Sequence, residues 1–244
     1  MAFSKHNIIP YEDFSISIRC KDQTKKNQPG FWILHGSGGI STNDDIWVEE
    51  ALDKDYVVIQ IDGYSGRGIY KQYWTSADEK RVHPYIRAID LKKAYYHLVN
   101  NYHLVPFWNM SDNIALGFSD GGTAAVWLQT KDFDNIWKDS YALYPGLLGQ
   151  YYPPELNEVD GNKIHLFVGE LDNWTKKECC LLYQQNTNCH LTIWKDAHHS
   201  YSKPGVDNVW PDVFAYAMGP GWEGVRAKYS EEATKGTMNY VFTS

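Results

Sequence analysis

A sharp turn between an apolar run and a helical segment constrains this chain more than any other feature. The turn is Gly117–Gly122, of sequence GFSDGG, and it lies between Ile114–Leu116 and the helical segment Thr123–Thr130. A strand that enters a helix through so tight a turn crowds its own backbone, and glycines two residues before and after the serine relieve that crowding. The turn predicts a strained backbone at Ser119, with the hydroxyl exposed at the carboxyl edge of a sheet.

Short apolar runs of strand length alternate with longer segments of helical pattern. Runs rich in β-branched and aromatic residues are typical of buried parallel strands. Six such runs are expected here: Phe31–Leu34, Tyr56–Ile61, Ile114–Phe118, Tyr141–Tyr144, Ile164–Val168 and Leu191–Trp194. A further run, Ser15–Arg19, alternates between apolar and polar residues and predicts a half-exposed antiparallel strand near the sheet edge.

Helices are expected at Asp45–Leu52, Tyr85–Asn101 and Thr175–Gln185, and a last one is capped by Ser230. The alternation implies an α/β fold with a mostly parallel central sheet and helices on both faces. The chain shows no repeat and no domain-separating linker, so 1–244 is expected to form one domain without a separate cap domain. Loops 63–80 and 203–223 carry aromatics or glycines and are candidates to cover a pocket.

Composition excludes several classes of partner. The net charge of −7 with no long basic run argues against nucleic acid or an anionic membrane as the main partner. Met1–Cys20 has no apolar signal-peptide region and no run is long enough to span a membrane, so a cytoplasmic location is expected. The four cysteines have no metal-binding spacing and are too few for a disulfide scaffold, so neither a metal site nor a disulfide framework is expected.

Two further polar groups follow predicted strands in an order that suits Ser119. A serine nucleophile needs a base within hydrogen-bonding reach, and the base needs an orienting acid. Asp172 follows the strand Ile164–Val168, and His198 and His199 follow Leu191–Trp194. Because parallel strands gather their ligands at their carboxyl ends, these groups are expected to meet as a catalytic triad.

An acyl-transfer site also needs donors for a developing oxyanion. The backbone N–H of Asp120, which opens the helix after the nucleophile, is expected to be one donor. The second is expected from the glycine-rich loop His35–Gly39, at the backbone N–H of Ser37, with Gly38 as the alternative.

Four segments together resemble the dienelactone hydrolase family of the α/β-hydrolase superfamily. They are Leu34–Gly39, Asp62–Gly68, Gly169–Thr175 with Cys179 beyond it, and Trp194–Tyr201. The resemblance extends from about Gly30 to the last predicted helix. It implies the α/β-hydrolase fold and cleavage of a small-molecule carboxylic ester or lactone without a cofactor.

The family pattern aromatic-x-Gly-Ala-x-His-x-aromatic aligns His199, rather than His198, with the catalytic base. Two positions depart from the family. Dienelactone hydrolases proper carry a cysteine nucleophile where this chain has Ser119, and Asp196 replaces the glycine before the alanine. Both departures favour a serine-bearing branch and make dienelactone itself a poor candidate substrate.

Side chains in the motif loops are the candidates for contact with substrate: His35, Tyr64, Arg67, Trp174 and Tyr201. Tyr70, Tyr73 and Trp74 belong to the same group of loop aromatics, which either line a pocket or cover the core. Arg67 and Arg81 either bind a substrate carboxylate or form ordinary ion pairs.

The motifs therefore predict a hydrolase that cleaves an ester or lactone through an acyl-enzyme on Ser119, with His199 and Asp172 completing the triad. The oligomeric state is not predicted. One alternative is a peptidase or amidase on the same scaffold, although the chain has no propeller or cap to supply subsites. The other is a non-catalytic binding protein for a small molecule, against which the complete set of triad residues argues.

Overall fold

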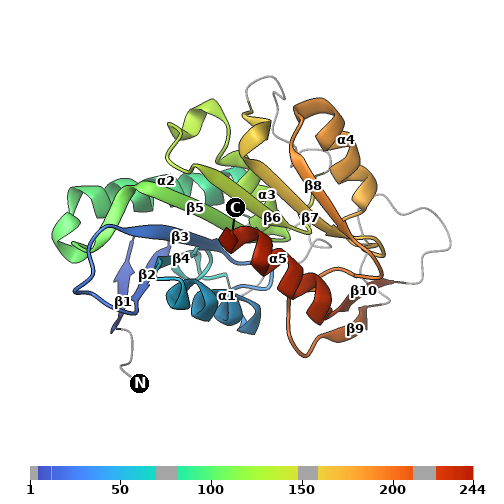
Figure 1. The fold of residues 1–244 in the computed structure, drawn as a ribbon, viewed down its shortest axis with the longest axis horizontal. Helices are drawn as coiled ribbons and strands as arrows, with labels where there is room; N and C mark the ends of the chain where they lie inside the picture. Colours follow the sequence, from blue (N-terminus) through green and yellow to red (C-terminus); the bar gives the residue numbers. More distant parts are fainter. Residues whose placement is uncertain (1–4, 12, 70–81, 148–158, 211–223, 244) are drawn as a thin grey trace.

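An eight-stranded sheet forms the centre of the protein in a computed structural model, which describes residues 5–11, 13–69, 82–147, 159–210 and 224–243 (Figure 1). Its strands, in chain order, are β1 (Lys5–Pro10), β2 (Ser15–Cys20), β3 (Gln28–Leu34), β4 (Val57–Asp62), β5 (Trp108–Phe118), β6 (Asp139–Leu143), β7 (Ile164–Gly169) and β8 (His190–Trp194). The spatial order is β1-β2-β4-β3-β5-β6-β7-β8. The six strands β3 to β8 pair in parallel, whereas β2 pairs antiparallel with both β1 and β4.

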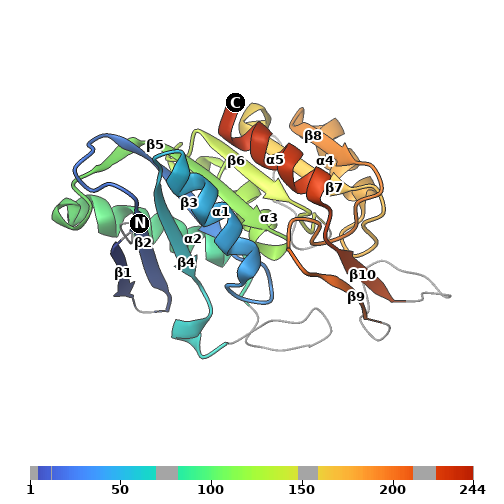
Figure 2. The same cartoon turned by 60° about the horizontal axis from the view of Figure 1, so that its bottom comes forward.

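Helices cover both faces of this sheet, as predicted (Figure 2). On one face lie α1 (Thr42–Asp53) and α5 (Glu231–Thr243), and on the other lie α2 (Pro84–Asn100), α3 (Asp120–Trp127) and α4 (Lys177–Thr187). Side chains alternate along each strand, so Phe167 of β7 packs toward α1 and α5 while Leu166 packs toward α3 and α4. Short 3₁₀ turns occupy Ser65–Arg67, Tyr102–Leu104, Lys131–Phe133 and Gly161–Lys163.

The predicted strands are all present, and β2 lies next to the edge strand with alternate residues buried. Two features escaped prediction. The edge strand β1 pairs only with β2 and ends at Pro10. The second is a small antiparallel ribbon of β9 (Asp207–Trp210) and β10 (Val225–Lys228), whose first strand is largely exposed and so lacks an apolar signature. Strand β9 lies within the predicted covering loop 203–223. Residues 211–223 of that loop, and residues 70–80 of the other predicted covering loop 63–80, lie outside the described residues.

Helix starts depend on capping groups. α1 begins at Thr42, ahead of the predicted Asp45, because Ser41 and Asp44 form a reciprocal capping box. The predicted cap of α5 is confirmed, since the Ser230 hydroxyl accepts a hydrogen bond from the Ala233 N–H at 3.3 Å.

Across the described ranges, no helix combines the length and apolar character needed to cross a bilayer.

Candidate active site

Ser119 stands at the junction of β5 and α3 in the strained conformation that the motif predicts. Its backbone angles are φ 53° and ψ −115°, and its N–H donates to the Leu143 carbonyl at 2.8 Å. A Cβ on Gly117 would lie 2.0 Å from the Gly121 carbonyl oxygen, and a Cβ on Gly121 would lie 2.3 Å from the Leu34 carbonyl oxygen. Both flanking glycines are therefore required by close backbone approach, and the strained backbone predicted at Ser119 is confirmed.

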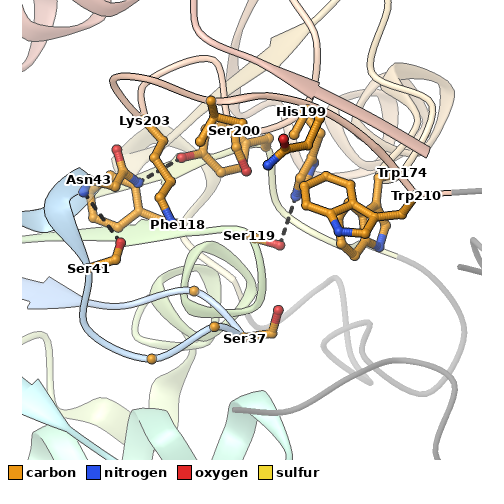
Figure 3. Close-up of a pocket in the computed structure, with 17 residues that line it drawn as sticks. Ser37, Ser41, Asn43, Phe118, Ser119, Trp174, His199, Ser200, Lys203 and Trp210 are labelled. Atoms are coloured by element: carbon orange, nitrogen blue, oxygen red, sulfur yellow. Dashed lines mark hydrogen bonds between the residues drawn. The ribbon is translucent and has the colours of Figure 1, made fainter. Parts of the chain in front are cut away.

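Three loops at the carboxyl ends of β5, β7 and β8 bring Ser119, Asp172 and His199 together. His199 Nε2 lies 3.1 Å from the Ser119 hydroxyl oxygen (Figure 3). The other ring nitrogen, His199 Nδ1, lies 2.9 Å from Asp172 Oδ2. All three side chains are buried, with Ser119 the most exposed at 7%. The geometry lets the imidazole accept a proton from the serine at one nitrogen while the carboxylate holds the proton on the other.

The neighbouring His198 takes no part in this arrangement. No hydrogen bond joins it to Ser119 or Asp172 within the described chain, and its Nδ1 is buried without a partner. The Lys228 N–H donates to the His199 carbonyl at 3.1 Å, and this bond ties the histidine loop to β10. The backbone thus directs His199, and not His198, toward the serine.

The glycine-rich loop after β3 passes directly beside the serine. A Cβ added at Gly36 would lie 3.8 Å from Ser119 Cβ, and the loop turns through a Gly39 N–H to Gly36 carbonyl bond of 3.1 Å. Ser37 points toward Ser119 from this loop (Figure 3). The Asp120 N–H lies in the first turn of α3, where backbone donors face outward. Both predicted oxyanion donors thus belong to segments that adjoin Ser119, and their role stays a prediction.

A cavity of about 320 Å³ opens onto Ser119. Trp174 and Trp210 stand on one side of the serine, and Ser41, Asn43 and Lys203 stand on the other (Figure 3). Among the described residues that line the cavity, Lys203 is the only lysine or arginine, and none is a carboxylate. No group of three or more His, Cys, Asp or Glu side chains in the described ranges is arranged to hold a metal ion.

Solved structures share this architecture over the length of the chain. A putative dienelactone hydrolase from Klebsiella pneumoniae subsp. pneumoniae matches 98% of this chain and 96% of its own, with a TM-score of 0.72 and 13% identity. MGS-M1, an α/β-hydrolase enzyme from a Medee basin deep-sea metagenome library, matches over 83% and 86%, with a TM-score of 0.60 and 18% identity. The chain has the α/β-hydrolase fold.

The esterase Est2 of the Planctomycetes species Thermogutta terrifontis is a further match, over 98% of this chain and 92% of its own, with a TM-score of 0.62 and 13% identity. No protein-family model matches the sequence, and no curated protein matches it either. At these identities the likeness is one of fold. The resemblance to the dienelactone hydrolase family that the four motifs carry is therefore supported at the level of the fold.

Of the five side chains predicted to contact substrate, the structure places only Trp174 in the wall of the cavity. Its ring lies 4.9 Å from the His199 ring and 5.6 Å from that of Trp210, between centroids. The prediction is wrong for Tyr201, which is fully buried and whose hydroxyl bonds Thr237 Oγ1 at 3.1 Å. Tyr201 does not line the cavity, and its ring belongs to the apolar cluster that contains Ala233 and Val241 of α5.

His35, Tyr64 and Arg67 do not line the cavity either. His35 and Tyr64 are buried beneath the turn Gly117–Gly122, here called the elbow, where the Tyr64 hydroxyl lies 3.4 Å from Asp120 Oδ2. Arg67 forms a bidentate ion pair with Asp90, at 2.7 and 3.0 Å, which agrees with the ion-pair alternative. The loop after β3 reaches the cavity through Gly36–Gly39, while the His35 side chain is buried, and no residue of Asp62–Gly68 lines the cavity. Arg81, Tyr70, Tyr73 and Trp74 lie outside the described residues.

Thr175 is a site residue to which the sequence analysis assigned no role. Asp172 Oδ1 accepts the N–H groups of Trp174 and Thr175 at 2.9 and 2.8 Å. The Thr175 hydroxyl lies 2.9 Å from Asp172 Oδ2, 3.1 Å from His199 Nδ1 and 2.9 Å from the Tyr144 carbonyl oxygen. Part of the signal was available, because an aspartate side chain commonly accepts the N–H two residues on in an Asx turn, here that of Trp174.

Replacing Thr175 with valine should lower kcat about tenfold and leave KM nearly unchanged, since a hydrogen bond to a charged group contributes about 1.5–3 kcal/mol. The carboxylate keeps its two backbone donors, so the melting temperature should fall only slightly. Steady-state ester hydrolysis checks the prediction, and Thr175→Ser is the matched control that restores the hydroxyl. A valine variant with the wild-type kcat contradicts it.

His35 is a buried histidine that the fold keeps neutral. Burial lowers the pKa of His35 to about 3, and the nearby Arg87 guanidinium acts in the same direction. The unfolded chain protonates this group near its ordinary value of 6.5. Between those two values the unfolded state binds the extra proton, so the free energy of unfolding should fall as the pH is lowered through this window.

The contribution of His35 to the slope of the unfolding free energy against pH should be at most about 1.4 kcal/mol per pH unit. His35→Asn should flatten the dependence of unfolding free energy on pH between about 3 and 6.5. Burial raises the pKa of Asp44 to about 6, and this group contributes a slope of opposite sign to the unfolding free energy of both proteins. The readout is therefore the difference in unfolding free energy between the variant and the wild type at each pH. Urea unfolding at several pH values provides it. Parallel curves for the two proteins refute the prediction.

Proposed function

We propose that this protein hydrolyses a carboxylic ester or lactone of a small molecule, with Ser119 as the nucleophile. The observation that carries the proposal is the 3.1 Å separation of His199 Nε2 from a serine hydroxyl held at a strained elbow. Strain of this kind persists where the surrounding structure enforces it, and it is common at catalytic groups. The fold likeness to an esterase and to a putative dienelactone hydrolase supports an ester as substrate.

In the proposed reaction, the Ser119 oxygen attacks the substrate carbonyl while His199 Nε2 takes the serine proton. Asp172 keeps the imidazole in the tautomer that carries its proton on Nδ1. The N–H groups of Ser37 and Asp120 stabilise the oxyanion of the tetrahedral intermediate. His199 then gives its proton to the leaving alkoxide, which leaves an acyl-enzyme on Ser119. Water, activated by the same imidazole, releases the acid and restores the serine.

The cavity supports a substrate with an apolar group on one side of the carbonyl. Trp174 and Trp210 offer an aromatic wall on that side, and Ser41 and Asn43 offer polar contacts on the other. Lys203 and the lack of a carboxylate among the described lining residues disfavour a cationic substrate. A peptidase or amidase on the same scaffold is the second candidate, and it requires protonation of a poorer leaving group.

Rapid-mixing hydrolysis of p-nitrophenyl acetate tests the proposal. We expect a burst of p-nitrophenol close to one equivalent of enzyme, followed by slower turnover, because an acyl-enzyme forms before it is hydrolysed. A series of p-nitrophenyl esters, lactones and aminoacyl p-nitroanilides should then show turnover of esters or lactones above that of anilides. Faster turnover of the anilides favours the amidase. A folded protein that turns over none of these classes favours a binding role.

A further inference from the structure

A buried charged group lies directly behind the elbow and has no part in the reaction described above. Arg87 of α2 is 1% exposed. Its Nη1 donates to Asp120 Oδ2 at 2.7 Å, and its Nη2 donates to the His35 carbonyl and lies 3.2 Å from His35 Nδ1. The guanidinium stands 5.1 Å from the centre of the Tyr64 ring. His35, Tyr64, Arg87 and Asp120 thus form one cluster, here called the elbow cluster.

Stability alone does not account for this ion pair. Two charges buried in a protein lose their hydration, and apolar residues of similar volume often give equal or greater stability. Asp120 and Arg87 are both at most 1% exposed, so the full cost of burial applies to the pair. The pair is therefore better explained by what it holds in place than by the free energy it contributes.

The groups that Arg87 holds belong to the two segments that carry the candidate oxyanion donors. The His35 carbonyl, which accepts a hydrogen bond from Arg87, directly precedes the Gly36–Gly39 loop that contains Ser37. The Asp120 carboxylate belongs to the residue whose own N–H follows the nucleophile. One guanidinium therefore joins the end of β3 to the first turn of α3 behind Ser119. Its planar fork fixes the direction of both bonds, which a single ammonium group cannot do.

We propose that Arg87 is a positioning residue, which sets the spacing between the Ser37 and Asp120 N–H groups that receive the oxyanion. The inference rests on the proposed function. Oxyanion donors act only if they are aimed at the place where charge develops, and loss of one donor costs about 10²- to 10³-fold in kcat. Loosening both donors by removing Arg87 should reduce kcat less than that, by about 10- to 100-fold, and should leave KM nearly unchanged.

The double variant Arg87→Met/Asp120→Leu tests this proposal, because it removes both charges together and leaves no buried carboxylate unpaired. The Asp120 N–H is kept, since it belongs to the backbone. We expect a melting temperature close to that of the wild type, a kcat lower by about 10- to 100-fold and a KM within about threefold. The affinity for an alkyl boronic acid, which forms a tetrahedral adduct with a serine, should fall together with kcat/KM.

A second arginine–aspartate pair supplies the matched control. Arg67 and Asp90 are joined by two bonds beside the same helix, and neither contacts the elbow or the loop after β3 through a described hydrogen bond. Arg67→Met/Asp90→Leu should therefore keep the wild-type kcat and boronate affinity.

A folded Arg87→Met/Asp120→Leu protein with wild-type kcat and wild-type boronate affinity would overturn the inference. If that protein does not fold, Arg87→Lys decides, because it keeps the charge and loses the fork. A wild-type kcat in Arg87→Lys also overturns the inference, and a reduced kcat at constant KM supports it. Turnover that persists in Ser119→Ala rejects the proposed function itself. Turnover that depends on Ser119 but not on Arg87 rejects only the positioning role.

Discussion

Replacing His199 with alanine should lower kcat by about 10⁴- to 10⁶-fold, because the serine loses the base that accepts its proton. In the structure, His199 Nε2 is the imidazole nitrogen that lies 3.1 Å from the Ser119 hydroxyl. The same change at His198 should leave kcat within about threefold, since that side chain has no bond to the serine or to Asp172 in the described chain. Steady-state ester hydrolysis by the two variants measures both effects.

The adjacent histidines serve as each other's control, because both variants change the same loop. A melting curve for each confirms that the loop remains folded. If His198→Ala is the inactive variant and His199→Ala keeps its turnover, the assignment of the base is wrong.

Gly121→Ala should prevent folding or cost at least about 3 kcal/mol in the free energy of unfolding, as overpacking against fixed backbone does. An added Cβ would lie 2.3 Å from the Leu34 carbonyl oxygen and 2.4 Å from that of His35. Neither oxygen can move freely, because Leu34 belongs to the interior strand β3 and the His35 carbonyl accepts a hydrogen bond from Arg87. The soluble yield and the urea midpoint of the variant measure the effect.

Gly38→Ala is the control for that substitution. A Cβ at Gly38 meets no atom within 4 Å, so the free energy of unfolding should stay near the wild-type value. Equal stability of the Gly121 and Gly38 variants would show that the helix does not need a glycine at its contact with β3.

The parallel sheet and the meeting of three distant residues could be predicted from the sequence. Apolar runs mark buried strands, and a parallel sheet places all their carboxyl ends at one edge. Ser119, Asp172 and His199 each follow such a run, so the sheet itself brings them together. The glycines at 117 and 121 report close backbone approaches that the motif already implies.

The lining of the cavity could not be predicted in the same way. A motif shows where a loop begins but not which side of the backbone each side chain faces. His35, Tyr64 and Tyr201 all lie in motif loops and turn inward. Lys203 and Trp210 reach the cavity from the segment after the histidine loop, whose exposed strand β9 has no apolar pattern. Arg87 lies in the first turn of α2, where the sequence alone suggests an ordinary charged residue.

The most direct test of the account is the reaction of the purified protein with a fluorophosphonate, followed by mass spectrometry of its peptides. This reagent forms a stable adduct with a serine that a neighbouring base activates. The account predicts one adduct on the peptide that contains Ser119, loss of ester turnover in proportion to labelling, and no adduct in Ser119→Ala. A folded wild-type protein that stays unlabelled, or one labelled at another residue while turnover is lost, would contradict it.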